Sequence, residues 1–211
     1  MTSKFEVKFQ DFIQSEMNQD AAHDYSHVKR VVATSKQLCA EEHADIDVVL
    51  PAAYLHDCFS FAKNHPQKHM SSWYAAEKAI RFLRDIAYPE KHLEAIHHAI
   101  VAHSFSAQVE AVTLEAKVVQ DADRLDALGA IGIARCLQVS TLLDRPLYNH
   151  HDPFCRYREP EDNLFCIDHF YTKLFTIAEQ MNTQSGKGEA AKRVEFMRAY
   201  LEQLKQELGV E

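Results

Sequence analysis

Histidine and aspartate side chains recur in this sequence where they could ligate a metal ion. The His-Asp dipeptide occurs three times, at residues 23–24, 56–57 and 151–152, so the dipeptide alone does not identify a site. Only the pair at 56–57 ends an apolar segment, A-A-Y-L-H-D. A charged aspartate beside a core is costly unless it is paired, hydrogen-bonded or bound to metal. His56 and Asp57 are therefore candidates for chemistry, and the alternative is a core histidine followed by a solvated carboxylate.

Two other segments carry side chains of the same types. His27 lies one helical turn before Val31 and borders the apolar stripe of its expected helix. The segment V-V-Q-D-A-D-R-L-D-A-L-G places Asp121, Asp123 and Asp126 in an otherwise apolar stretch. On a continuous helix Asp123 and Asp126 are about 60° apart, whereas Asp121 points elsewhere. We therefore expect one helix face to carry Asp123 and Asp126.

Helices are expected to position these side chains. No glycine precedes Gly129, and hairpin turns favour glycine. Apolar residues recur at helical spacing between Val28 and Cys39. The expected helices span about 3–18, 25–42, 47–59, 68–87, 90–103, 113–143, 163–181 and 187–208. The fold class is therefore predicted to be all-α.

One long irregular segment, from Asp144 to Asp162, interrupts the expected helices. It holds three of the six prolines and is rich in His, Asp and Arg. Such a segment is either a functional loop or a bridge to a C-terminal helical pair. We expect a single domain over residues 1–211, with a core at about 20–145 and the loop and C-terminal helices at about 146–211.

Composition limits the class of protein. Acidic residues outnumber basic residues 31 to 23, which gives a net charge of −8 and argues against a broad binding surface for duplex nucleic acid. The five cysteines form no C-x-x-C pair, so neither a disulfide framework nor a cysteine zinc site is indicated. No apolar run reaches about 18 residues, and no signal-peptide pattern is present. We therefore expect a cytoplasmic protein without a membrane partner.

Three segments together resemble the successive motifs of the HD-domain phosphohydrolase superfamily: Y-S-H-V-K-R-V, A-A-Y-L-H-D and Q-D-A-D-R-L-D-A-L-G. A-K-N-H-P and A-H-S-F-S extend this resemblance to a small bacterial subgroup that includes nucleoside-triphosphate pyrophosphatases. The resemblance implies an HD-domain helical bundle with additional C-terminal helices. Matched residue by residue, it implies metal ligands at His27, His56, Asp57 and Asp123, with Asp121 as the alternative carboxylate.

Such a ligand set would hold one divalent ion. Two imidazoles and two carboxylates suit Mn²⁺, which we favour, and also Co²⁺, Ni²⁺, Fe²⁺ or Zn²⁺, with Mg²⁺ as a further candidate. On an octahedral ion, four protein ligands leave positions for water and a phosphate oxygen, and hydrolysis of a phosphate bond requires both. A closed structural metal site is the alternative, although such sites more often use cysteine.

Further residues are assigned to the substrate. Lys63 stands where the resembling subgroup has a lysine facing its pocket, and His103 could hydrogen-bond phosphate. Asp126 could orient water or a metal-bound histidine, or make a structural hydrogen bond. A C-terminal cap over the pocket is expected, with His169 and Lys173 on one helix face and Arg156 or Arg158 from the loop as further anion contacts. An exposed charged face is the alternative.

The resemblance implies a nucleotide phosphohydrolase, and cleavage of a nucleoside triphosphate to monophosphate and pyrophosphate is the first choice. A nucleoside-monophosphate phosphatase, a cyclic-nucleotide phosphodiesterase and a non-catalytic nucleotide or metal sensor are the alternatives. Many HD hydrolases have an acidic residue for acid/base chemistry shortly after the His-Asp pair. No acid lies between Cys58 and Lys63 here, which argues against an alarmone-hydrolase mechanism. A di-iron oxygenase would need two more ligands, such as His97 and His103. We expect His97 to be a core or surface histidine, and Cys58 to be a packing residue.

Overall fold

The computed structural model describes residues 3–17, 25–62 and 65–210. Within these ranges the chain forms nine α-helices, a π-helical turn and short 3-10 turns, and no strand. The predicted all-α fold class is confirmed. The chain divides into two compact units, Met1–Asp123 and Arg124–Glu211.

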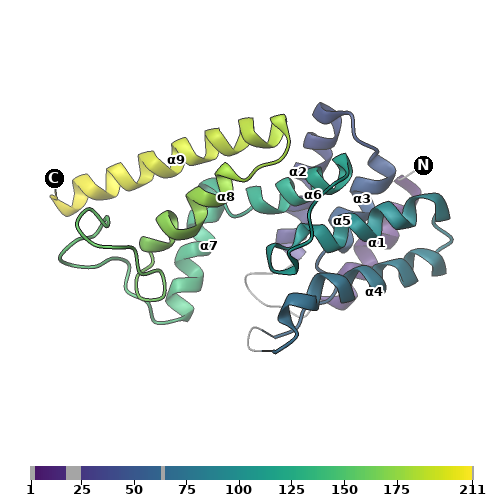
Figure 1. Cartoon of the computed structure of the whole chain (residues 1–211), viewed down its shortest axis with the longest axis horizontal. Helices are drawn as coiled ribbons and strands as arrows, with labels where there is room; N and C mark the ends of the chain where they lie inside the picture. The colour runs from purple at the N-terminus through teal and green to yellow at the C-terminus, as the bar shows by residue number, and fades with distance from the viewer. Residues whose placement is uncertain (1–2, 18–24, 63–64, 211) are drawn as a thin grey trace. The chain divides into compact units, whose positions relative to one another are not determined.

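The first unit is a bundle of helices in which α3 is central (Figure 1). Its helices are α1 (Ser3–Glu16), α2 (Tyr25–Glu42), α3 (Ile46–Leu55), α4 (Ser71–Asp85), α5 (Leu93–His103) and α6 (Leu114–Leu125). The 3-10 turns of this unit are Lys68–Met70, Glu90–His92 and Phe105–Ala107. Helix α3 packs against α1, α2, α4 and α5. The last two residues of α6 belong to the second unit.

Helix α3 is apolar on every side, which explains its central position. All residues from Val48 to Leu55 are buried, and a helix with no polar face must be surrounded by other elements. Its start is defined by Asp45, whose carboxylate accepts a hydrogen bond from the Asp47 backbone N–H at 2.9 Å. This N-cap satisfies one of the donors that the first turn leaves unpaired.

Pro51 lies inside α3, beyond the first turn. Proline has no N–H, so the carbonyl of Asp47 loses the hydrogen bond that residue 51 would donate. The Tyr88 hydroxyl donates to this carbonyl at 2.6 Å. Tyr88 is 5% exposed, and burial raises the pKa of its phenol. The tyrosine therefore compensates for the proline in the central helix.

We expect Tyr88→Phe to lower the free energy of unfolding by about 1 kcal/mol, because the carbonyl of Asp47 loses its donor. Urea denaturation followed by circular dichroism measures this change. Tyr74→Phe is the matched control, since Tyr74 makes ring contacts with Phe59 and Phe61 and its hydroxyl has no hydrogen bond within the described chain. Equal stability of the two variants would contradict the compensating role.

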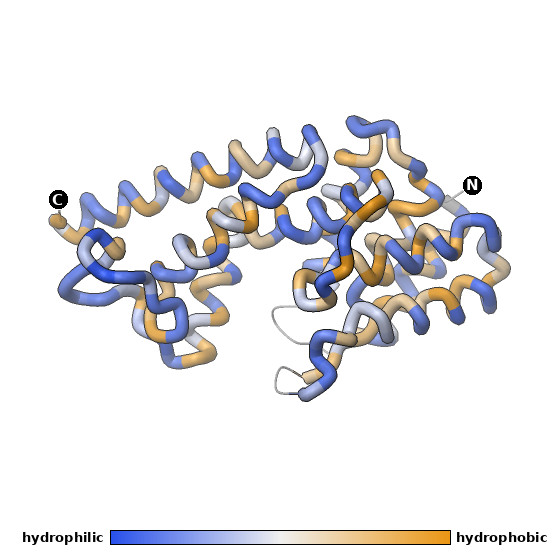
Figure 2. Tube along the Cα trace, viewed as in Figure 1, coloured by the Kyte–Doolittle hydropathy of each residue, from blue (hydrophilic) through white to orange (hydrophobic). Residues whose placement is uncertain are grey.

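The second unit is built on its C-terminal helix, against which α7 and α8 pack. Its elements are α7 (Gly129–Leu142), a π-helical turn (Phe170–Leu174), α8 (Phe175–Glu179) and α9 (Gln184–Leu208). Polar and apolar residues alternate along α9 (Figure 2), and Met197 and Leu201 are among its buried residues. They share the core of this unit with Ile167 and Phe170, both fully buried. Arg193 donates to the Leu125 carbonyl at 2.6 Å and so joins α9 to the end of α6.

Most expected helices have somewhat different bounds in the structure, and three differ most. The helix expected over 47–59 ends at Leu55, and the one expected over 163–181 starts at residue 168 and ends at Glu179. The continuous helix expected over 113–143 is wrong, because α6 and α7 are separated by a turn at 126–128. Gly132 permits this turn, since a Cβ there would lie 2.2 Å from the Ala127 carbonyl oxygen.

The long loop between α7 and the π-helical turn is fixed by two carboxylates. Asp152 accepts hydrogen bonds from the backbone N–H groups of Arg156 at 3.0 Å and Tyr157 at 2.7 Å. Asp168 is fully buried and accepts two hydrogen bonds from the Arg158 guanidinium, at 2.5 and 2.7 Å. The loop therefore has a defined conformation without regular secondary structure.

Among the described residues, no single helix is long and apolar enough to cross a membrane. The bent pair formed by Leu114–Leu125 and Gly129–Leu142 passes the same requirement on length and composition. Core helices also meet this requirement.

Candidate metal centre

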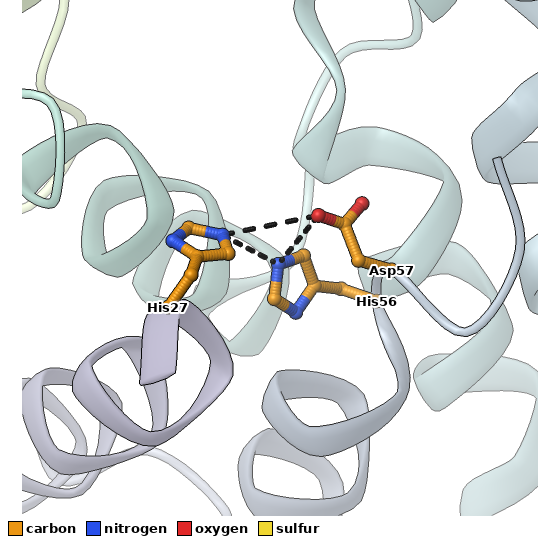
Figure 3. A group of neighbouring side chains, drawn as sticks. All are labelled: His27, His56 and Asp57. Atoms are coloured by element: carbon orange, nitrogen blue, oxygen red, sulfur yellow. Dashed lines mark hydrogen bonds and ion pairs between the residues drawn. The ribbon is translucent and has the colours of Figure 1, made fainter. Parts of the chain in front are cut away.

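Helices α2 and α3 bring two histidines together in the core of the first unit. His27 lies in the first turn of α2, and His56 caps the C-terminus of α3. His27 is 2% exposed and His56 is fully buried. Asp57 lies in the turn after α3, where its side chain is 18% exposed. The buried face of α2 thus carries His27 inward, and the end of α3 places His56 and Asp57 beside it (Figure 3).

The orientation of the His56 ring is set by the backbone of its own helix. Its Nδ1 lies 2.9 Å from the carbonyl oxygen of Ala53 and donates to it. A neutral imidazole that donates from Nδ1 has its lone pair on Nε2. This Nε2 lies 3.4 Å from Nε2 of His27, so a lone pair of His56 is directed at the second ring.

Two carboxylates complete the cluster. An oxygen of Asp57 lies 3.8 Å from His27 Nε2 and 3.6 Å from His56 Nε2. An oxygen of Asp123 lies 3.3 Å and 3.8 Å from the same two nitrogens. Donor atoms about 2.1 Å from one ion lie about 3.0 Å apart at right angles and about 4.2 Å apart across the ion. These distances fit donors that share one ion.

Helix α6 holds Asp123 at the cluster through a buried amide. Gln120 is 6% exposed and donates to the Ala102 carbonyl of α5 at 2.6 Å. It stands one turn before Asp123 on α6, so this hydrogen bond fixes the helix against α5. Gln120 is not among the residues predicted from the sequence. A single amide beside the apolar residues Val118 and Val119 was the feature that could have indicated its role.

The electrostatics of the cluster suit metal ligation. Burial lowers the pKa of His56, which keeps this imidazole neutral. Burial alone would raise the pKa of Asp123. The adjacent His27, His56 and His103 lower this pKa by more than burial raises it, so the carboxylate is ionised. Neutral imidazole and ionised carboxylate are the forms that bind divalent ions. The donor set therefore fits a divalent metal ion, and His27, His56 and Asp57 form the tightest group, with ligand atoms within 4.8 Å of one another.

His103 lies against the cluster at the end of α5. Its Nδ1 donates to the Ile100 carbonyl at 2.5 Å, and its Nε2 lies 3.7 Å from an oxygen of Asp57. Burial lowers the pKa of His103, but Asp57 and Asp123 raise it by more, so the net direction is upward. Its ring meets that of His56 edge to face at 4.9 Å. The side chain is thus placed as a hydrogen-bond donor beside the cluster.

The other predicted acids have different environments. Asp121 is fully buried in α6. The prediction that Asp126 shares a helix face with Asp123 is wrong, because α6 ends at Leu125 and Asp126 lies in the following turn. Its carboxylate accepts from Arg135 of α7 at 2.6 Å. That pairing accounts for the burial of Asp126 within the second unit.

The remaining candidates for substrate contacts are distributed over both units. Lys63 lies outside the described residues. Arg158 forms the buried pair with Asp168, which favours a structural role. Lys173 is exposed on the π-helical turn, and the adjacent His169 lies 3.0 Å from an oxygen of Asp162.

Three further side chains have structural partners. His97 lies 3.1 Å from a carboxylate oxygen of Glu77. His98 accepts from the backbone N–H of Val112 at 3.2 Å. Cys58 is 2% exposed, and burial raises the pKa of its thiol to about 12. A buried thiol of this kind is a packing group.

We expect Asp123→Asn to weaken Mn²⁺ binding at least about tenfold, because the charged ligand oxygen is lost. Asp121→Asn is expected to change the affinity less than about threefold. Isothermal titration with Mn²⁺ measures both variants beside the wild type. The reverse order would identify Asp121 as the ligand.

The sequence profile described as the HD domain matches residues 24–128. These residues contain the whole cluster. The chain belongs to the HD-domain family. An HD-superfamily hydrolase from Bacillus thuringiensis has the same fold, with 28% identity, a TM-score of 0.78 and complete coverage of both chains.

Two other solved structures align with this chain over nearly all of their length. A structure from Lactobacillus plantarum is 31% identical, with a TM-score of 0.74 and 98% of each chain covered. YpgQ of Bacillus subtilis in complex with ADP is 28% identical, with a TM-score of 0.75, and 98% of this chain and 97% of that chain are covered. The HD-domain fold of this chain is thus that of a family with hydrolase members.

Proposed function

We propose that this chain is a metal-dependent phosphohydrolase that cleaves a nucleoside triphosphate to a monophosphate and pyrophosphate. The proposal rests mainly on the convergence of two imidazole nitrogens and two carboxylate oxygens. The two nitrogens lie 3.4 Å apart, and each nitrogen lies 3.3 to 3.8 Å from an oxygen of each carboxylate. One divalent ion, with Mn²⁺ favoured, would be held by His27, His56, Asp57 and Asp123.

A divalent ion at this position would supply Lewis acidity toward a phosphoryl oxygen and activation of water. The histidines form the buried side of the cluster and the carboxylates the more exposed side, with Asp57 at 18% and Asp123 at 27% exposure. Substrate would therefore approach past the carboxylates. His103 is placed to hydrogen-bond a phosphoryl oxygen that comes to lie beside Asp57.

A nucleotide is favoured as the substrate by two lines of support. The YpgQ structure, which aligns over 98% of this chain, is a complex with ADP. The A-K-N-H-P and A-H-S-F-S segments resemble those of triphosphate pyrophosphatases. Both lines point to a ligand with linked phosphates.

The test is a panel of nucleoside mono-, di- and triphosphates and cyclic nucleotides with Mn²⁺, Co²⁺, Ni²⁺, Zn²⁺ or Mg²⁺ added. Chromatography would resolve nucleoside, monophosphate, phosphate and pyrophosphate. We expect triphosphates to give monophosphate and pyrophosphate in equal amounts. Phosphate released from monophosphates, or opening of cyclic nucleotides, would contradict the proposed bond. Binding without any turnover would identify a sensor.

The role proposed for Lys63 rests on the resemblance alone. We expect Lys63→Met to lower kcat for the best triphosphate by about 10²–10³-fold, the usual cost of one preorganised donor to a developing charge. Metal content should stay unchanged, because Lys63 is assigned to phosphate. Lys91→Met, at an exposed lysine of the first unit, is the matched control. Turnover of Lys63→Met within about threefold of wild type would remove Lys63 from the mechanism.

A further inference from the structure

The second unit has an open cavity of about 300 Å³. Its walls come from the long loop, from the π-helical turn with α8, and from α9. The lining side chains that matter most are aromatic or cationic: Phe154, Arg156, Tyr171, Phe175, Arg198 and Lys205. Binding sites for small molecules begin at about this volume.

The cavity has an excess of positive charge in an acidic protein. Arg156, Arg198 and Lys205 face one lining acid, Glu202, whereas the whole chain carries a net charge of −8. Within the described residues, no carboxylate forms a salt bridge with any of the three cations. A local cluster of three cations with one acid favours the binding of an anion.

The other arginines of the second unit bind protein acceptors. Their partners are Gln180 for Arg124, Asp126 for Arg135, Asp162 for Arg145, Asp168 for Arg158 and Leu125 for Arg193. In the described chain, the guanidinium groups of Arg156 and Arg198 have no such hydrogen bond. These two arginines are therefore available to a ligand, and guanidinium matches phosphate by two-point hydrogen bonding.

Aromatic rings lie beside the cations. Tyr171 and Phe175 meet edge to face at 5.9 Å, one helical turn apart. The Arg198 guanidinium lies 4.7 Å from the centre of the Phe175 ring. Aromatic and guanidinium planes are the surfaces on which nucleobases stack. The cavity thus combines donors for phosphate with platforms for a planar ring.

The loop side of the cavity is held in place. The backbone N–H of Arg156 is bonded to Asp152. On either side of Arg156, Cys155 has a positive φ of 54° and Arg158 is paired with buried Asp168. A non-glycine residue in this conformation persists only where its surroundings impose it. A wall that is already ordered lowers the entropic cost of binding.

We propose that this cavity binds a nucleotide-class ligand, with phosphate on Arg156, Arg198 and Lys205 and the base against Tyr171 and Phe175. Every lining residue belongs to the second unit, and none is part of the metal cluster. Binding at the cavity therefore needs no divalent ion. The proposal stands apart from the proposed hydrolysis, and either can fail without the other.

Calorimetric titration of the full-length protein with ADP in excess EDTA tests the cavity. We expect wild type to bind ADP and the double variant Arg198→Met/Lys205→Met to bind at least about tenfold more weakly, because two charge-assisted contacts are lost. The matched control is Lys187→Met/Lys192→Met, which removes two exposed positive charges from the same helix. It should bind within about twofold of wild type.

Adenosine and inorganic pyrophosphate separate the two parts of the ligand. Each should bind at least about tenfold more weakly than ADP, since each lacks either the phosphates or the ring. Hydrogen exchange then locates the site. ADP in EDTA should protect amides of residues 150–160 and 195–208 in wild type and not in the Arg198→Met/Lys205→Met variant.

Four results would overturn the proposal. These are no ADP binding by wild type in EDTA, equal affinities of the two double variants, pyrophosphate or adenosine binding as tightly as ADP, and protection confined to the first unit.

Discussion

His56→Ala and Asp57→Ala are expected to lose the bound divalent ion and nucleotide turnover together. Each removes one donor from the proposed site, in which two nitrogens and two carboxylate oxygens would share one ion. We expect the metal affinity to fall more than about 100-fold, beyond the usual effect of a residue that only supports a ligand. Turnover should fall about 10³-fold or more, since the ion supplies several kcal/mol to the transition state. Metal analysis after dialysis and kcat at saturating Mn²⁺ measure the two losses.

A histidine outside the cluster provides the matched control for these variants. His97 is partly exposed and pairs with Glu77 in the same unit. His97→Ala should keep metal content and turnover within about threefold of wild type. Helical circular dichroism should be unchanged in all three variants. Wild-type metal occupancy in both His56→Ala and Asp57→Ala would show that the ion binds elsewhere.

Arg158→Met is expected to cost about 3–5 kcal/mol in the free energy of unfolding of the second unit. The substitution leaves the carboxylate of Asp168, which is fully buried, without its guanidinium. An uncompensated buried charge is strongly destabilising. The double variant Arg158→Met/Asp168→Leu should recover much of the loss, because it removes the charge as well. Urea titration followed by circular dichroism gives the values.

An exposed salt bridge and the fluorescence of the single tryptophan serve as controls. Arg84 and Glu90 pair at 2.9 Å with side chains 58% and 69% exposed, so Arg84→Met should cost less than about 1 kcal/mol. The single tryptophan, Trp73, lies in the first unit, so its fluorescence reports that unit alone. Equal effects of Arg158→Met and Arg84→Met would show that the Arg158 pair does not hold the loop.

The same pair predicts a dependence of stability on pH. Burial raises the pKa of Asp168, but the hydrogen bonds from Arg158 and from the Glu161 backbone lower it by more, so its pKa lies below the usual range. A depressed carboxyl pKa stabilises the folded state above the unfolded value of about 3.9. This contribution is lost as the pH falls through the folded value. Arg158→Met should therefore lose less stability than wild type between about pH 5 and pH 2.

Much of the site could be predicted from sequence, because its residues lie in short motifs whose local structure is helical. His27 stands on the apolar face of α2, which helical periodicity identifies, and His56 ends the apolar segment that forms α3. The predicted cluster of His27, His56, Asp57 and Asp123 is brought together in one unit. Its distances depend on how three separate helices pack, which the spacing within each helix does not determine.

The misjudged elements have identifiable physical causes. The turn at 126–128 interrupts an apolar, helix-forming stretch, and the close approach of Gly132 to the Ala127 carbonyl has no signature in periodicity. The cavity of the second unit joins loop residues to α9 across more than 40 positions of sequence. The i, i+4 spacing of Tyr171 with Phe175, and the i, i+7 spacing of Arg198 with Lys205, were the available signals. Neither indicates which segments meet.

The proposed metal site is tested most directly by anomalous diffraction from crystals of the Mn²⁺-loaded protein, recorded on both sides of the manganese absorption edge. We expect one strong anomalous peak per chain, within bonding distance of Nε2 of His27 and His56 and of carboxylate oxygens of Asp57 and Asp123. A peak bonded to other residues, or no ordered peak in crystals of protein that hydrolyses nucleotides with Mn²⁺, would contradict it.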